Sequence, residues 1–242
     1  MAESTSKNSS GADPAGKQPR PASRHGRWLL LAAAALLAWD ASSLDMPVAR
    51  WAGTAHGFAW RDHWLMTTVL HTGGRVVAWA LALALGLAVW WPVGALRRVS
   101  RAARLQLAGG ALLAVLLVSV LKSQSPAPCP WDLTDFGGAG HAVSHWLWTA
   151  LAGVSGRCFP AGHASSAFAF IGGWYVFRQP APGLARAWLW AVLLAGLALG
   201  LGQQWRGAHF TSHTLWTAWL CWAVAFGLDR VRAHWAPDPC GT

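Results

Sequence analysis

Six long apolar segments constrain the fold of this chain more than any other feature. They cover approximately residues 28–44, 76–96, 104–121, 163–178, 187–205 and 212–229. Each is close to the roughly 20 residues that a helix needs to cross a bilayer. Because a helix satisfies its own backbone hydrogen bonds in lipid, we predict an all-α polytopic membrane protein. Its single domain, residues 28–229, is expected to be a bundle of six transmembrane helices.

The composition agrees with this prediction. Only 12% of the residues are charged, about half the share of roughly 25% that is usual in soluble domains. The chain also has 19 tryptophans, a residue type that is enriched at membrane–water interfaces. An ordinary soluble enzyme is therefore excluded.

The two ends and the two long connections are more polar than the segments. Residues 1–27 are predicted to be a disordered basic tail, and residues 230–242 a short second tail. A signal peptide is the alternative for the start, but no small-residue cleavage site follows "WLLLAAAALLAW", so an uncleaved first helix is preferred. The stretches "WRDHWLMTTVLHTG" and "GHAVSHWLWTALAGVSG" in the connections are each expected to form a helix that lies in the interface.

Charge gives the orientation. With six spans both termini lie on one side, and that side carries thirteen of the 19 lysines and arginines. The positive-inside rule places both termini in the cytoplasm. The net charge of +10 is mostly this topological signal. Nucleic acid is not expected as a partner, because the chain has no folded basic domain outside the membrane.

Histidines show the opposite asymmetry, since eight of the ten fall on the outer side. For His56, His63 and His71 a plain interfacial role explains the position equally well. His163, His209 and His213 lie at span boundaries, close to the outer-side cations Lys122, Arg157 and Arg206. Three cations and three imidazoles at one rim indicate an anionic substrate, most simply a phosphate. Carboxylates are scarce on that side, which argues against glycosidase chemistry.

A metal site is an alternative. His209 and His213 are spaced i, i+4, as are His141 and His145, and on a helix each pair would share a face that suits zinc or haem. No HExxH motif is present, because the only glutamate lies in the amino-terminal tail. We therefore expect no metal and no other cofactor.

Three short motifs resemble those of the type 2 phosphatidic acid phosphatase superfamily, whose membrane members have six spans. The family pattern Lys-x6-Arg-Pro is matched by "KSQSPAPCP" at Lys122 and Pro130, with Cys129 in place of the arginine. Pro-Ser-Gly-His is matched by "PAGH" at residues 160–163, with Ala161 in place of the serine. Ser-Arg-x5-His-x3-Asp is matched by "GQQWRGAHFTSH" at His209 only, with Gln203 and His213 in place of the arginine and aspartate.

The resemblance implies a mechanism without metal. His209 would be the nucleophile that forms a phosphohistidine, His163 the general acid, and Lys122 a clamp on the phosphoryl oxygens. The backbone at Ala161 and Gly162 would donate to those oxygens at the start of the fourth span. His213 would accept a hydrogen bond from His209. Arg206 and Arg157 would replace the missing family arginines.

Cys129 and Cys158 lie in one outer loop, and we predict that they form a disulfide; two free buried thiols are the alternative.

The implied activity is hydrolysis of a phosphate monoester or diphosphate on a membrane lipid. The alternatives are a lipid phosphotransferase and a catalytically inactive module that binds lipid. The expected location is a bacterial inner membrane, with the active site facing the periplasm. The oligomeric state is not predicted.

Overall fold

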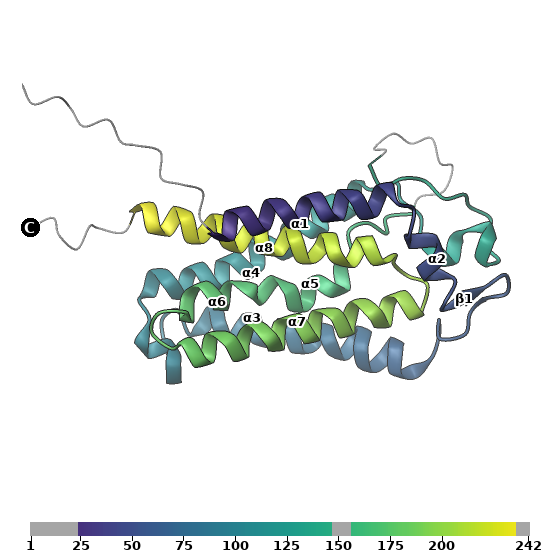
Figure 1. Ribbon diagram of the computed structural model, residues 1–242. Helices are drawn as coiled ribbons and strands as arrows, with labels where there is room; N and C mark the ends of the chain where they lie inside the picture. Colours follow the sequence, from purple (N-terminus) through teal and green to yellow (C-terminus); the bar gives the residue numbers. More distant parts are fainter. Residues whose placement is uncertain (1–23, 147–155, 236–242) are drawn as a thin grey trace, which may run out of the picture.

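The computed structural model describes residues 24–146 and 156–235, and most of these residues are helical. Long helices lie side by side along one axis, and α2 and β1 lie together at one end of them (Figure 1). The elements are α1 (Arg24–Ala41), α2 (Asp45–Ala49), the antiparallel pair β1 (Gly53–Thr54) and β2 (Gly57–Phe58), a π-helix (Leu65–Gly73), α3 (Gly74–Leu87), α4 (Arg101–Gln124), α5 (Gly162–Phe168), α6 (Gly172–Phe177), α7 (Pro182–Trp205) and α8 (Thr211–Trp235). Short 3-10 turns cover 94–98, 130–132, 134–136 and 169–171.

Three helices of the described chain are long and apolar enough to cross a membrane: Leu65–Leu87, Arg101–Gln124 and Pro182–Trp205. Their outward faces carry large apolar side chains, such as Val77, Leu116 and Trp190, which are at least 60% exposed. Water does not favour such a surface, whereas lipid does. The chain is therefore a helical protein of membrane type.

The other three helical segments do not combine this length with this apolar character. α1 contains two arginines and Asp40. The run 162–177 is divided into α5, a 3-10 turn and α6. α8 has Ser212 and His213 in its first turn and charged residues in its last two turns. The six-span arrangement therefore stays a prediction, although all six predicted segments are largely helical.

Two predictions about the connections need correction. The stretch 60–73 is not a separate interfacial helix, because from Leu65 onward it is the π-helix that continues directly into α3. The second span consequently begins at Leu65 and ends at Leu87, about ten residues earlier than predicted. Of the stretch 140–156, residues 147–155 lie outside the described residues, and 141–144 are not helical. The predicted tails fall mostly outside the described residues too, but α1 begins at Arg24 and α8 extends to Trp235.

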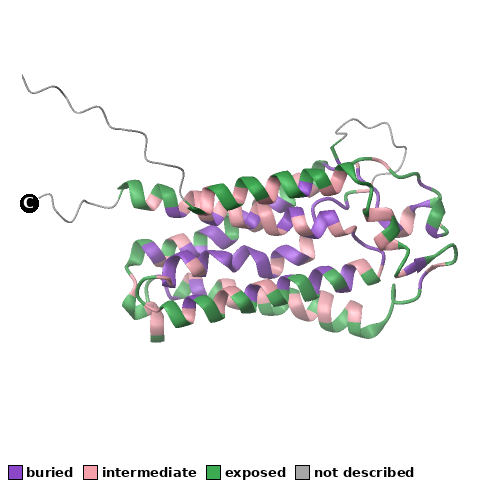
Figure 2. Ribbon diagram, in the orientation of Figure 1, coloured by how far each residue is buried: buried purple, intermediate pink, exposed green. Residues whose placement is uncertain are grey.

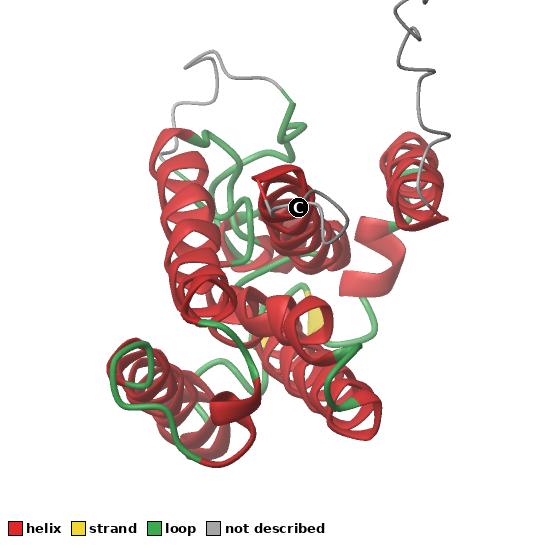
Figure 3. Ribbon diagram, turned by 90° about the vertical axis from the view of Figure 1, so that its left-hand side faces the viewer, coloured by secondary structure: helices red, strands yellow, loops and turns green. Residues whose placement is uncertain are grey.

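The middle of the molecule is a buried helix. Figure 2 shows α5 and α6 mostly in the colour of buried residues, and Figure 3 shows the helices of the bundle from one end. Glycines on α7 allow the close approach: a Cβ at Gly196 would overlap the Phe168 ring of α5, and one at Gly200 would overlap Thr214 of α8. Small residues at helix crossings are typical of bundles in lipid, where packing rather than water drives association.

The start of α8 is held by a carboxylate from another helix. Asp45 of α2 accepts hydrogen bonds from the backbone N–H of Ser212 at 3.0 Å and from the Ser212 hydroxyl. The Trp39 indole N–H donates to the same carboxylate at 2.9 Å. A negative charge at a helix amino terminus satisfies otherwise unpaired N–H groups and interacts well with the helix dipole. This contact fixes the position of the residues around the start of α8.

We predict that Gly196→Ala destabilises the protein and that Gly109→Ala does not. At Gly196 the added methyl group meets the fully buried Phe168, whereas at Gly109 no other part of the described chain lies within 4 Å. Overpacking of this kind costs about 1–3 kcal/mol. Thermal unfolding in detergent measures the difference. Equal midpoints for the two variants would contradict the tight crossing of α5 and α7.

Candidate functional site

Four side chains from three helices and one loop meet at the end of the bundle where α5 and α8 begin. Lys122 lies in the last turn of α4, His163 in the first turn of α5, His209 directly before α8, and His213 in its first turn. His209 and His213 are 4% and 2% exposed. Burial lowers the pKa of His209 well below its usual value, and the nearby Lys122, His213 and His163 lower it further. At neutral pH His209 is therefore an uncharged imidazole.

A backbone carbonyl orients the His209 ring. The Cys158 oxygen lies 2.6 Å from His209 Nδ1. Because a carbonyl can only accept, Nδ1 carries the proton and Nε2 keeps its lone pair. The prediction that His213 accepts this hydrogen bond is therefore wrong. The two rings are in edge contact with centroids 5.8 Å apart, and the family's aspartate is replaced in this role by the Cys158 carbonyl.

His213 and Ala161 are joined through their backbones. The Ala161 N–H donates to the His213 carbonyl at 3.2 Å. The Thr217 hydroxyl lies within hydrogen-bond distance of two carbonyl oxygens, that of His213 at 2.8 Å and that of Ala161 at 3.2 Å. The Ala161 N–H is therefore not free to bind a phosphoryl oxygen, contrary to the prediction. The next residue, Gly162, lies beside the Lys122 side chain. A Cβ at Gly162 would be in van der Waals contact with the lysine, 3.5 Å from its Cδ.

Arg206 is held in place beside these groups. Its Nε donates to the Arg61 carbonyl at 2.7 Å, and its Nη1 donates to Gln203 Oε1 at 3.2 Å. The guanidinium also lies over the Trp131 ring, 5.8 Å from its centroid. Its positive charge acts on His163. The buried Gln203, which occupies the family's arginine position, keeps an amide nitrogen without a hydrogen-bond partner in the described chain.

Arg157 is not part of this cluster in the structure. It is exposed and has a positive φ of 46°. Its backbone N–H donates to the Ser125 carbonyl at 3.2 Å. Its charge is absent from those that act on His163 and His209. Arg206 is therefore the better replacement for a family arginine.

His71 belongs to the cluster, although no motif in the sequence selects it. Its ring lies against that of His163, with centroids 3.7 Å apart and an interplanar angle of 34°. It comes from the π-helix Leu65–Gly73, a rare conformation that is often found at functional sites. The only hint in the sequence was the outer-side excess of histidine, which an interfacial role explains equally well.

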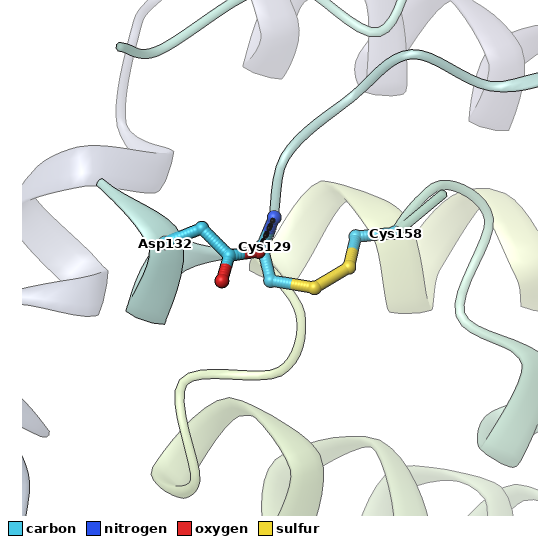
Figure 4. Close-up of side chains that lie close together, drawn as sticks. All are labelled: Cys129, Asp132 and Cys158. Atoms are coloured by element: carbon cyan, nitrogen blue, oxygen red, sulfur yellow. Dashed lines mark hydrogen bonds between the residues drawn. A yellow bond between two sulfur atoms is a disulfide. The ribbon is translucent and has the colours of Figure 1, made fainter. Parts of the chain in front are cut away.

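A disulfide closes the loop that carries the Cys158 carbonyl. Cys129 and Cys158 are bonded, with their Cα atoms 5.2 Å apart, and Asp132 lies beside them (Figure 4). These three residues are the only group in the described chain with donor atoms close enough for a metal, but bonded sulfurs are not thiolate ligands. The pairs His141/His145 and His209/His213 do not share a helix face, because His141 and His209 lie outside helices.

An apolar groove leads away from the cluster. A cavity of about 420 Å³ lies between α3 and α7 and follows α5. Its lining is almost entirely apolar and includes Leu70, Val77, Ala167, Phe170 and Leu199. Leu70 directly precedes His71, and the groove begins on α5 at Ser166, one turn after His163. The groove therefore offers space for a hydrocarbon chain next to the cluster.

Comparison with known proteins gives one match. A family model of the PAP2 superfamily matches residues 103–235, which is more than half of the chain. The matched region contains Lys122, His163, His209 and Arg206 but not His71. No curated protein and no solved structure matches.

We predict that the disulfide stabilises the fold. Closing a loop of 29 residues contributes about 3–4 kcal/mol in the chain-entropy model. Reductant should therefore lower the thermal midpoint of the wild type and leave that of a Cys129→Ser/Cys158→Ser variant unchanged. Mass spectrometry of protein isolated without reductant should find the two cysteines linked. Two alkylatable thiols under denaturing conditions would contradict the bond.

Proposed function

Because the chain belongs to the PAP2 superfamily, whose members are phosphoesterases, we propose that it is a membrane lipid phosphatase. It hydrolyses a phosphate monoester or diphosphate on a lipid through a phosphohistidine intermediate. The observation that carries this proposal is the orientation of His209. Its Nε2 is left with a lone pair by the Cys158 hydrogen bond, and Lys122 and His163 are its close neighbours.

The chemistry proceeds in two steps. His209 Nε2 attacks phosphorus while the bond from phosphorus to the lipid oxygen breaks, and His163, in its protonated imidazolium form, gives its proton to that oxygen and becomes neutral. Water then attacks the phosphohistidine, His163 takes a proton from the water, and inorganic phosphate leaves with His209 restored. Division of the transfer into two steps lowers each barrier. Lys122 and Arg206 supply the positive charge that stabilises the phosphoryl oxygens in both steps.

The apolar groove supports a lipid as the substrate. A phosphate held between His209 and His163 places the leaving alcohol on the His163 side. The groove begins on α5 one turn from His163. An acyl or prenyl chain can therefore extend along α5 between α3 and α7, where its burial contributes about 0.8 kcal/mol per CH₂.

We assign six spans and two cytoplasmic termini to the protein. The first residues of α1 and the last residues of α8 lie at the same end of the bundle (Figure 1), and the excess of lysine and arginine is on that side. The site and the disulfide lie at the other end. A disulfide persists in an oxidising compartment, so this end faces the periplasm if the membrane is a bacterial inner membrane.

We predict that His209→Ala and His163→Ala each lower turnover at least about 100-fold. The measurement is released phosphate from a panel of lipid phosphates offered to purified protein in detergent. His56→Ala is the matched control, since His56 is an exposed histidine at the same end. Wild-type activity should persist in a chelator. Near-normal phosphate release by His209→Ala protein would refute the mechanism.

We also predict that Arg206→Lys loses most of the activity, although the charge is kept. A guanidinium can hold two phosphoryl oxygens and keep its bonds to Gln203 and Arg61, whereas an ammonium cannot form this fork. Arg50→Lys is the control, because Arg50 is exposed and pairs with Asp135. Equal activity of the two variants would show that Arg206 is not the clamp.

A further inference from the structure

A second cavity is lined by His213 and lies apart from the apolar groove. It measures about 550 Å³ and is lined by α1, the start of α2 and the loop around residues 142–146. Its polar lining includes Asp40, Asp45, His145 and His213, and no lysine or arginine of residues 24–146 or 156–235 lines it. The mechanism proposed above uses no group that lines this cavity.

Asp40 is the unusual residue of this cavity. Its side chain is only 9% exposed. One oxygen, Oδ2, accepts from the indole N–H groups of Trp146 and Trp216 at 3.0 and 2.9 Å, and His145 Nε2 lies 3.3 Å away. The other oxygen, Oδ1, is buried and has no hydrogen-bond partner in the described chain. A buried acceptor without a partner is costly and points to a missing ligand.

Within the part of the chain that the structure describes, no lysine or arginine pairs with Asp40. Its only ion-pair neighbour in the described chain is His145. Burial lowers the pKa of His145 more than Asp40 and Asp45 raise it, so this imidazole is mostly neutral at pH 7. Asp45 differs, because its carboxylate binds the amino terminus of α8. The loop sequence 141–156 contains no lysine or arginine.

The cavity suits an organic cation better than a metal ion. No three possible metal-ligand atoms at this cavity, among the described residues, lie within 4.8 Å of one another. Aromatic side chains surround it instead, namely Trp39, Trp146 and Phe210. Aromatic rings around a carboxylate are a setting in which ammonium groups bind well.

We propose that this cavity binds the ammonium group of a membrane lipid headgroup, with Asp40 as its counter-ion. The ammonium lies beside the Asp40 carboxylate and against the aromatic side chains that line the cavity. Because His213 forms a wall of the cavity and lies in edge contact with His209, the occupant sits next to the phosphate site. The inference does not depend on hydrolysis.

Binding to the wild-type protein in detergent tests the proposal. The probes are a short-chain diacyl phospholipid with an ethanolamine headgroup, the same lipid N-acetylated, and free ethanolamine, each measured by calorimetry. We expect the amine lipid to bind at least about tenfold more tightly than the N-acetylated lipid, which corresponds to 1.4 kcal/mol. Tight binding of free ethanolamine would show that the ammonium group in the cavity belongs to a soluble amine and not to a lipid. Equal affinity for the two lipids, with no binding of ethanolamine, would overturn the proposal.

Two kinds of variant locate the effect. Asp40→Asn removes the charge and should abolish the preference for the amine. Because this change also touches two indole contacts, Ala142→Lys is a second test that leaves Asp40 intact. Ala142 is exposed and lines the cavity, so a lysine there supplies a competing cation, and Ala142→Gln is its neutral control. A preference that survives both Asp40→Asn and Ala142→Lys would place the amine elsewhere.

Discussion

The hydrogen bond between the His209 ring and the Cys158 carbonyl is the interaction on which the candidate site depends. It decides which nitrogen of His209 is free, and it ties the loop before α8 to the segment before α5. That segment is itself held by the bond from the Cys158 N–H to the Ala127 carbonyl, by the backbone contact with His213 and by the disulfide to Cys129. A neutral carbonyl fixes the tautomer as a carboxylate would. It does not offset the charge of a protonated imidazole, and burial favours the neutral form of His209.

The bundle provides the low-dielectric surroundings that make this arrangement effective. Apolar side chains face outward along its length, while the polar side chains of Gln203, Ser212, His213 and Thr217 are buried at one end. Electrostatic interactions are stronger where water is excluded, so in the mechanism that we propose Lys122 and Arg206 would act on a phosphate more strongly there than at a surface. The close helix crossings at Gly196 and Gly200 help to exclude that water.

Much of the fold and part of the site could be predicted from the sequence. The six apolar segments correspond to helices, and the order of three degenerate motifs was sufficient to select Lys122, His163 and His209 and to suggest the family. Contacts between distant segments could not be predicted. The use of the Ala161 N–H by His213, the carbonyl acceptor for His209 and the exposure of Arg157 all depend on how loops pack. His71 was missed for the same reason, because its only distinguishing feature is a ring contact with His163.

The π-helix before α3 has a consequence for how this protein tolerates changes in length. A π-turn holds one more residue than an α-turn, so the segment Leu65–Gly73 sets the rotation of everything on either side of it. Deletion of a single residue there would restore α-helical winding and turn His71 away from His163 while α3 kept its place in the bundle. Substitutions along the lipid-facing surface are mild by comparison. The number of residues in this π-helix is therefore more constrained than the identity of its side chains. Changes in length are better accommodated in the connections at the ends of the bundle.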